Sequence, residues 1–168
     1  MLHLILGGAR SGKSRHALTV DVTGYSRQLF VATSEAIDEE MQDRIEKHRS
    51  ERDHSWQTVD APVNLTTTLS TLDDTTSLIV VDCLTVWLGN LMHYERDVDA
   101  EVDKLAAFFT NANGHYVVVS NEVGQGVVPD SKMGREFRDY QGRLNQQLAA
   151  IAQRVELVVA GIPINIKS

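Results

Sequence analysis

Short apolar runs recur along this 168-residue chain. The runs 29–32, 78–81, 116–119 and 157–160 are uninterrupted and rich in β-branched residues, which is typical of strands buried on both faces of a parallel sheet. A further apolar run, 2–6, opens the chain. These runs predict the strands of a central sheet.

Helical patterns lie between the predicted strands. The spacing of apolar residues predicts two amphipathic helices, one carrying Val98, Val102, Leu105 and Phe109, the other Phe137, Leu144, Leu148, Ile151 and Val155. A further helix is expected at 84–92. Alternating strands and helices indicate right-handed crossovers and a three-layer α/β fold that binds ligands at the carboxyl ends of its strands. After Gly161-Ile162-Pro163, the run 164–166 predicts an antiparallel edge strand.

Composition limits the classes of protein that fit. The length suits a single domain, residues 1–168. A formal net charge of −7 with no Lys/Arg stripe argues against a nucleic-acid partner. Cys83 is the only cysteine, so no internal disulfide can form. Because no signal segment and no stretch of 18 apolar residues is present, we expect no membrane span and a cytoplasmic location.

The clearest motif follows the first strand directly. The eight residues are Gly7, Gly8, Ala9, Arg10, Ser11, Gly12, Lys13 and Ser14, a complete G-x-x-x-x-G-K-[ST] phosphate loop. A strand, a glycine-rich turn and a helix start aim backbone N–H groups at one point, where a triphosphate can bind. Lys13 would reach the β/γ-phosphates and the Ser14 hydroxyl would hold Mg²⁺. The expected fold class is therefore the P-loop NTPase-type three-layer fold (RecA-like), with a mostly parallel sheet.

Asp82 ends the run 78–81. It could cap the helix that begins at Leu84, or complete a Mg²⁺ shell beside the phosphate loop. The presence of the phosphate loop favours the metal role.

The segment 43–52 is strongly charged. If it is helical, Arg44, His48 and Arg52 lie on one face, where guanidinium groups could bind phosphate oxygens beside an imidazole. Spacing alone favours the alternative, a solvated helix whose acidic and basic residues pair with one another.

A loop at 120–129 follows the strand 116–119. Asn121 and Glu122 there could meet a polar acceptor substrate. The next helix has an unusually polar face, for ligand or subunit contacts, that includes Arg135, Arg138, Asp139 and Asn145. A turn followed by a surface helix explains the same pattern equally well. Four other histidines have no chemical partner nearby in the sequence and are expected to be structural: His3, His16, His93 and His115.

Several blocks of the chain together resemble one enzyme family. They are 7–14, Ala32-Thr33-Ser34, Arg44-Ile45 with His48-Arg49-x-x-Arg52, Trp56-x-Thr58, 121–129, and Arg135-x-Phe137-Arg138-Asp139 with Gly142 and Asn145-Gln146. In this order, from the first strand to the C-terminus, they are similar to the bifunctional adenosylcobinamide kinase / adenosylcobinamide-phosphate guanylyltransferase of cobalamin biosynthesis.

This resemblance implies two reactions. Adenosylcobinamide, a corrinoid, would be phosphorylated with ATP or GTP, and GMP from GTP would then be attached to that phosphate through a guanylylated histidine. The histidine that matches is His48; His54 lies outside the motif. A neutral imidazole is a competent nucleophile, and neighbouring arginines would neutralise phosphate charge.

The resemblance also implies nucleotide contacts beyond the phosphate loop. They fall on Thr33, Ser34, Glu35, Arg49, Ser50, Glu51, Arg52, Asp60 and Asp82. The family commonly has Pro and Glu where this chain has Asp53 and Asp60, so a contact at position 60 would be made by a shorter carboxylate. The resemblance further suggests a homo-oligomer, a trimer with sites near its subunit boundaries.

Two other functional classes remain as alternatives. One is a monofunctional small-molecule kinase in which His48 forms no covalent adduct. The other is a RecA-like protein that binds a macromolecule as it holds nucleotide, a reading that the acidic balance disfavours.

Overall fold

A computed structural model describes residues 1–35 and 55–168 of the chain. The strands are β1 (Leu2–Gly7), β2 (Arg27–Ala32), β3 (Trp56–Asp60), β4 (Ser77–Asp82), β5 (His115–Asn121), β6 (Arg154–Val159) and β7 (Ile162–Lys167). The helices are α1 (Lys13–Ala17), α3 (Leu65–Leu72), α4 (Leu84–His93), α5 (Val98–Asn111) and α6 (Lys132–Ile151).

The described strands form one sheet in the order β3-β2-β4-β5-β1-β6-β7. All neighbours are parallel except β7, which pairs antiparallel with β6 at the edge. The expected α/β fold and the antiparallel C-terminal edge strand are therefore confirmed. Strand β5 lies between β1 and β4, so the phosphate-loop strand and the strand that ends in Asp82 are not direct neighbours.

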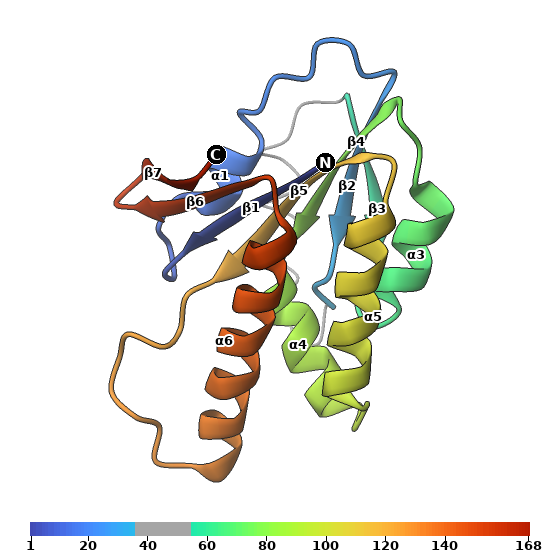
Figure 1. Cartoon of the computed structure of the whole chain (residues 1–168). Coiled ribbons are helices and arrows are strands. Elements are labelled where there is room, and N and C mark those ends of the chain that lie inside the picture. Colours follow the sequence, from blue (N-terminus) through green and yellow to red (C-terminus); the bar gives the residue numbers. More distant parts are fainter. Residues whose placement is uncertain (36–54) are drawn as a thin grey trace.

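The described helices cover the two faces of the sheet unequally (Figure 1). On one face α3, α4, α5 and α6 enclose the larger hydrophobic core, in which Trp87 of α4 is fully buried. The short helix α1 lies on the other face, over a smaller core that includes Ile5, Ala17 and Val158. None of the helices in the described part of the chain is long and apolar enough to cross a membrane.

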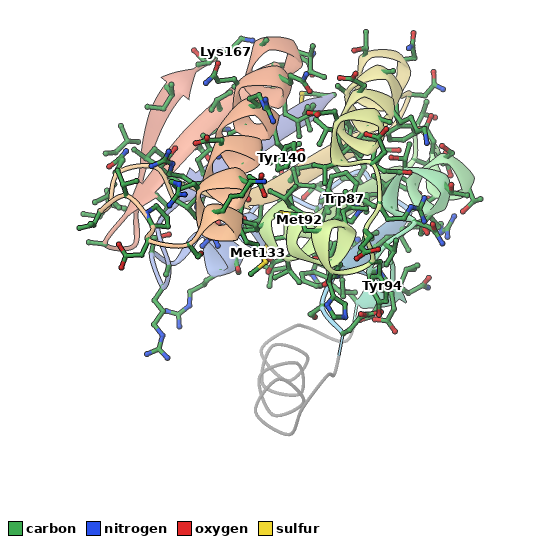
Figure 2. The ribbon with its side chains drawn as sticks, turned by 90° about the horizontal axis from the view of Figure 1, so that it is seen from below. Trp87, Met92, Tyr94, Met133, Tyr140 and Lys167 are labelled. Carbon is green, nitrogen blue, oxygen red and sulfur yellow. The ribbon has the colours of Figure 1, made fainter. Side chains whose placement is uncertain are left out.

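Two hydrogen bonds from the C-terminal strand β7 hold the end of α6. The Lys167 ammonium on β7 donates to the carbonyls of Ala149 and Ala150 at 3.0 and 2.9 Å, and Figure 2 shows Lys167 beside that end of α6. These carbonyls belong to the last turn of the helix, where intrahelical donors run out and a cation is favourable. The same view has Trp87 among the helices and Tyr94 at the margin of the molecule.

The boundary between α6 and β6 differs from the prediction. Val155 continues the helical spacing, but α6 ends at Ile151 and Val155 lies in β6, paired with Leu4 of β1. Pairing of the Gln153 N–H with the Leu2 carbonyl (3.0 Å) begins the strand earlier than its apolar run indicates. The strand expected at 157–160 therefore spans 154–159, and Ala160 lies in a turn with a φ of 51°.

Two elements were not anticipated. Strand β3 is an edge strand with an exposed and half-buried pattern, so it lacks the apolar run that marks the central strands. Helix α3 buries only Leu65 and Leu69 in a segment dominated by threonine, whose preference for helix is weak. Both elements owe their conformation to packing against neighbours rather than to a strong local pattern.

Candidate nucleotide-binding site

The phosphate loop connects β1 to α1 at the carboxyl end of the sheet (Figure 1). Arg10 and Gly12 have φ angles of 55° and 95°, the left-handed region, which curls the backbone between strand and helix. A Cβ on Gly7 would lie 2.8 Å from the Val158 carbonyl oxygen, and a Cβ on Gly12 would lie 3.2 Å from the Gly161 Cα. Glycine therefore lets the chain pass close to strand β6 at Gly7 and close to the β6–β7 turn at Gly12.

Lys13 is almost completely buried at the start of α1. Its ammonium donates to the Gly8 carbonyl oxygen at 3.0 Å, so the side chain folds back over the loop. Burial lowers the pKa of Lys13, while the nearby Asp82 carboxylate opposes that shift. Gly8, Ala9, Arg10 and Gly12 are exposed residues. A cation and exposed loop residues thus lie together, as binding of an anionic phosphate requires.

Asp82 and Thr33 meet where β2 and β4 end. Ala32 is in register with Asp82, and the Thr33 N–H donates to the Asp82 carbonyl at 3.2 Å. The fully buried Thr33 hydroxyl accepts from the Cys83 N–H at 2.9 Å and donates to the Cys83 carbonyl at 2.8 Å. Thr33 therefore holds the backbone beside Asp82, and because its single hydroxyl hydrogen is already donated, the hydroxyl could meet a nucleotide only as an acceptor.

Three other residues predicted to contact nucleotide lie at the same edge of the sheet. Asp60 ends β3 in register with Ala32, on the side of β2 opposite to Asp82. Ser34 is half-buried, and the Glu35 carboxylate accepts a hydrogen bond from the Tyr94 hydroxyl at 2.9 Å. Carboxylates thus follow or end three adjacent strands, and the phosphate loop lies two strands away from Asp82.

Asn121 ends β5, between the phosphate loop and Asp82. It is in register with Gly7, and the N–H of the next residue, Glu122, donates to the Gly7 carbonyl at 3.0 Å. The Asn121 N–H donates to the Thr85 hydroxyl at 2.8 Å, and its carbonyl accepts from the Asn145 amide at 2.9 Å. Both backbone groups of Asn121 are therefore fixed by side chains of α4 and α6.

A buried polar layer supports this strand end from α6. The Ser120 hydroxyl donates to the Asn145 side-chain oxygen at 2.7 Å, and the Gln141 amide donates to both groups at 2.9 and 3.0 Å. Asn145 is only 6% exposed, so it does not belong to the polar surface expected for this helix. Arg135 instead donates to the carbonyls of Pro129 and Asp130, which ties the start of α6 to the preceding loop.

A cavity of about 480 Å³ opens beside the phosphate loop. Its walls are Gly8, Ala9, Arg10 and Ser11 of the loop, Glu122 and Gln125 after β5, and residues 157–160 of β6 and the turn that follows. An open groove of about 570 Å³ lies elsewhere, between α3 and α5, and contains none of the phosphate-loop residues. In the cavity beside the phosphate loop, a ligand could therefore reach both the loop and Glu122.

The donors available for a metal ion are oxygens. Ser14 in the first turn of α1 and Asp82 at the end of β4 offer a hydroxyl and a carboxylate, the ligand types that Mg²⁺ prefers. No group of three or more His, Cys, Asp or Glu side chains in the described ranges could hold a metal ion alone. These residues fit Mg²⁺ that takes most of its ligands from phosphate oxygens and water.

The second predicted cluster lies outside the described residues. It comprises His48 and the nucleotide contacts expected at Arg49, Ser50, Glu51 and Arg52, together with Arg44 and His54. Their roles remain predictions from the sequence.

Some residues that support the site are not predicted from the sequence. Thr85 and Asn90 of α4 and Gln141 of α6 carry no motif signal; the Asn90 amide donates to the Thr33 and Pro62 carbonyls, both at 2.8 Å. A polar residue on the apolar side of a helix, as Gln141 is beside Leu144 and Leu148, was the only available hint.

Sequence comparisons match almost the entire chain. A family model described as cobinamide kinase / cobinamide phosphate guanyltransferase matches residues 3–166. The chain is 39% identical over 182 residues to the bifunctional adenosylcobalamin biosynthesis protein CobU of Escherichia coli (strain K12), covering 99% of this chain and 100% of that protein. It is 39% identical over 169 residues to the bifunctional adenosylcobalamin biosynthesis protein CobP of Pseudomonas aeruginosa, with 99% and 98% covered.

A comparison of structures agrees on the fold. The assembled ATPase EscN of the enteropathogenic E. coli type III secretion system superimposes with a TM-score of 0.54 at 10% sequence identity, over 95% of this chain and 43% of that one. At so low an identity the likeness concerns architecture alone, and it confirms a P-loop NTPase-type fold.

Proposed function

Because the chain belongs to the cobinamide kinase / cobinamide phosphate guanyltransferase family of transferases, we propose that it performs both reactions of that family on a corrinoid. It phosphorylates adenosylcobinamide with ATP or GTP, then transfers GMP from GTP to adenosylcobinamide phosphate, which gives adenosylcobinamide-GDP. The full-length family match, residues 3–166, is the observation that carries this proposal.

In the kinase step the phosphate loop and Lys13 bind and orient the nucleoside triphosphate. Positioning and neutralisation of charge supply most of the rate enhancement in phosphoryl transfer, since little covalent chemistry is required of the protein. The exposed residues of the loop and the buried Lys13, whose ammonium folds over the loop, support this role. The remaining nucleotide contacts that we propose among the described residues are Thr33, Ser34, Glu35, Asp60 and Asp82.

Ser14 and Asp82 would hold Mg²⁺ beside the phosphates. When bound, the ion neutralises charge that develops on the transferring phosphoryl group. Asp82 has a second effect, since its charge favours the protonated form of the buried Lys13. This carboxylate therefore keeps a cation in place at the site even though burial disfavours one.

We propose that Glu122 receives the acceptor. Glu122 lines the same cavity as Gly8, Ala9 and Arg10, and one carboxylate oxygen is held by the Gly124 N–H at 2.6 Å. The acceptor hydroxyl could donate a hydrogen bond to this carboxylate while it faces the phosphate loop, which would orient it for attack. A cavity of about 480 Å³ suits one arm of a corrinoid rather than the whole ring.

In the guanylyl step His48 attacks the α-phosphorus of GTP, pyrophosphate leaves, and the phosphate of the corrinoid then takes the GMP. In the second displacement the corrinoid phosphate attacks the phosphorus of the guanylylated histidine, and the bond from that phosphorus to the His48 nitrogen breaks. The corrinoid phosphate thus attacks a group with less negative charge than the triphosphate. Arg49 and Arg52, within the contact run that includes Ser50 and Glu51, would neutralise the phosphate charge.

We further propose that the protein acts as a homo-oligomer, and a trimer in keeping with the family. The edge strand β7 supports this because Ile162, Ile164 and Ile166 are 66, 47 and 61% exposed and occupy alternate positions on one face. An apolar face on an edge strand is commonly covered by a partner chain.

A cytoplasmic location remains a prediction from the sequence.

Intact-protein mass spectrometry after incubation with GTP and Mg²⁺ tests the two-step mechanism. We expect a GMP adduct on the native chain and on His54→Ala but not on His48→Ala, which lacks the proposed nucleophile. Acid should remove the adduct, because a phosphoramidate is acid-labile. A native chain without an adduct would leave the monofunctional kinase as the better reading, provided that phosphorylation of adenosylcobinamide is observed.

A further inference from the structure

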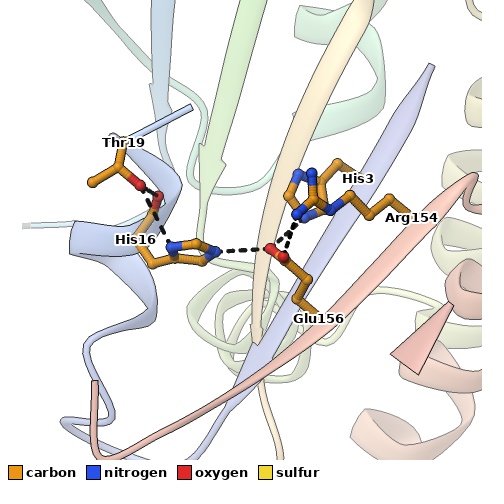
Figure 3. A network of polar contacts seen from close by, with 5 residues as sticks. All are labelled: His3, His16, Thr19, Arg154 and Glu156. Atoms are coloured by element: carbon orange, nitrogen blue, oxygen red, sulfur yellow. Dashed lines mark hydrogen bonds and ion pairs between the residues drawn. The ribbon is translucent and has the colours of Figure 1, made fainter. Parts of the chain in front are cut away.

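A buried carboxylate next to the phosphate loop has no part in the chemistry described above. Glu156 of β6 is 3% exposed and lies beneath α1, on the face of the sheet that this helix covers. Its oxygen Oε2 accepts from His3 Nε2 at 2.8 Å and from His16 Nε2 at 2.7 Å, and Oε1 accepts from the Arg154 guanidinium at 2.5 Å (Figure 3). Three donors from three elements therefore converge on one carboxylate.

The two histidines differ in what they attach to it. His3 belongs to β1, which already pairs with β6 through the backbone hydrogen bonds of the sheet. His16 belongs to α1, three residues after Lys13 and two after Ser14. Only the His16 contact thus joins the carboxylate to the helix that presents the residues of the phosphate site.

Helix α1 needs such an attachment. It has five residues, far fewer than a helix requires to be stable without tertiary contacts. Lys13 and Ala17 are its buried residues, and Lys13 is committed to the phosphate loop, so Ala17 alone provides an apolar contact from within the helix. A hydrogen bond to a charged acceptor is stronger than one between neutral groups, which suits His16 to supply the missing attachment.

A second contact joins the same hairpin to the loop itself. The Gly161 N–H, in the turn between β6 and β7, donates to the Ser11 carbonyl at 2.8 Å. The β6–β7 hairpin therefore contacts the phosphate loop at Ser11 and the helix after it at His16, on both sides of Lys13. Neither Gly161 nor Glu156 belongs to the sequence motif.

We propose that Glu156 is a positioning residue for nucleotide binding, which acts by holding α1 against the sheet through His16. This inference rests on the proposed nucleotide site. Loss of the His16 contact lets α1 shift, and the Lys13 ammonium and Ser14 hydroxyl then no longer face the phosphates together. The His3 contact stabilises the fold without affecting the ligand.

Matched substitutions of the two histidines test the proposal. The amide nitrogen of glutamine reaches about as far as Nε2 of histidine, whereas that of asparagine reaches only as far as Nδ1. His16→Asn therefore removes the donor to Glu156, His16→Gln retains one, and His3→Asn removes the other donor to the same oxygen. The His16 side chain is 21% exposed, so its replacement leaves the core intact.

The measurement is a titration of each folded variant with a fluorescent GTP analogue in the presence of Mg²⁺, with Lys13→Ala as reference. We expect His16→Asn to raise Kd about tenfold, the equivalent of one hydrogen bond to a charged group, and His16→Gln and His3→Asn to stay within about twofold of the native value. His3→Asn should instead lower the thermal unfolding midpoint.

The results distinguish an error in the role of Glu156 from an error in the nucleotide site. If Lys13→Ala weakens binding but His16→Asn binds as the native protein does, or if His3→Asn weakens binding as much as His16→Asn, the positioning role of Glu156 is wrong. If the native protein does not bind the analogue, or Lys13→Ala binds it equally well, the nucleotide site itself is wrong.

Discussion

Lys13 combines burial with a positive charge, two properties that normally oppose each other. Burial lowers its pKa, and the Asp82 carboxylate and the Gly8 carbonyl favour the charged form. A cation that is already desolvated and held in place loses little on binding a phosphate, which is the physical advantage of this arrangement.

Replacement of Lys13 by alanine should therefore abolish most of the kinase activity. We expect kcat/KM for phosphorylation of adenosylcobinamide to fall about a hundredfold or more, the size of effect seen when one stabilising charge is removed from a reaction centre. Lys104→Ala is the matched control, because Lys104 is exposed on α5 and pairs only with Glu101 among the described residues. Equal losses in the two variants would contradict the role of Lys13.

Thr33 is predicted to contact the nucleotide, but it also has a structural role. Its hydroxyl makes two hydrogen bonds to the backbone of Cys83 in a fully buried position. Thr33→Val, which leaves a buried N–H without a partner, should lower the free energy of unfolding by about 1–2 kcal/mol, whereas Thr33→Ser retains the bonds. Urea denaturation measures this, and a Val variant as stable as the Ser variant would argue against the structural role.

At the scale of elements, the carboxylate of Asp73 secures the amino end of strand β5. Asp73, after α3, accepts from the Tyr116 hydroxyl at 2.7 Å, from the Gly114 N–H at 2.8 Å and from the Asn113 N–H at 3.1 Å. Burial by itself would raise the pKa of Asp73, but these hydrogen bonds outweigh it and the pKa is lowered. Asp73 thereby ties α3 to the start of β5.

This lowered pKa predicts how stability depends on pH. Because the folded pKa lies below the unfolded value, the contribution of Asp73 is complete above about pH 4 and is lost as the pH falls through the folded pKa. Asp73→Ala should cost about 1–3 kcal/mol at pH 7, and the difference from the native protein should shrink at lower pH. Denaturation curves at pH 7 and pH 3 with the same difference would contradict this.

At the scale of the whole molecule, the two edges of the sheet differ. Strand β3 at one edge is polar and half-exposed, whereas β7 at the other presents three exposed isoleucines. The hairpin that carries them also contacts the phosphate loop through Gly161. An assembly formed on β7 would therefore lie close to the nucleotide site.

Ile164→Lys should dissociate the proposed oligomer, because a charge in the middle of the isoleucine row would have to be buried without a partner. Light scattering after size exclusion measures the mass of the particle. Val22→Lys, at an exposed apolar position before β2, should leave the mass unchanged. A native protein of monomer mass, or an Ile164→Lys variant with the native mass, would be evidence against assembly through β7.

Features that depend on neighbours in the sequence were predictable for this chain. The phosphate loop, the buried central strands and helices α4 and α5 follow from glycine positions and the periodicity of apolar residues, both of which act over a few residues. The placement of Asp82 and Asn121 at one edge follows from the same source, because each ends or follows a strand that the apolar runs predict, whereas Asp60 ends β3, which has no such run.

Tertiary structure decided which of these features meet. Val155 fits a helical stripe and yet forms a strand, because pairing with β1 outweighs the local pattern. His3 and His16 had no partner in the sequence, and they find Glu156 some 150 residues away. A local sequence sets the conformation of a segment and the face that it can bury. Which side chain lies opposite it depends on the order of strands in the sheet, and that order is fixed only when the entire core packs.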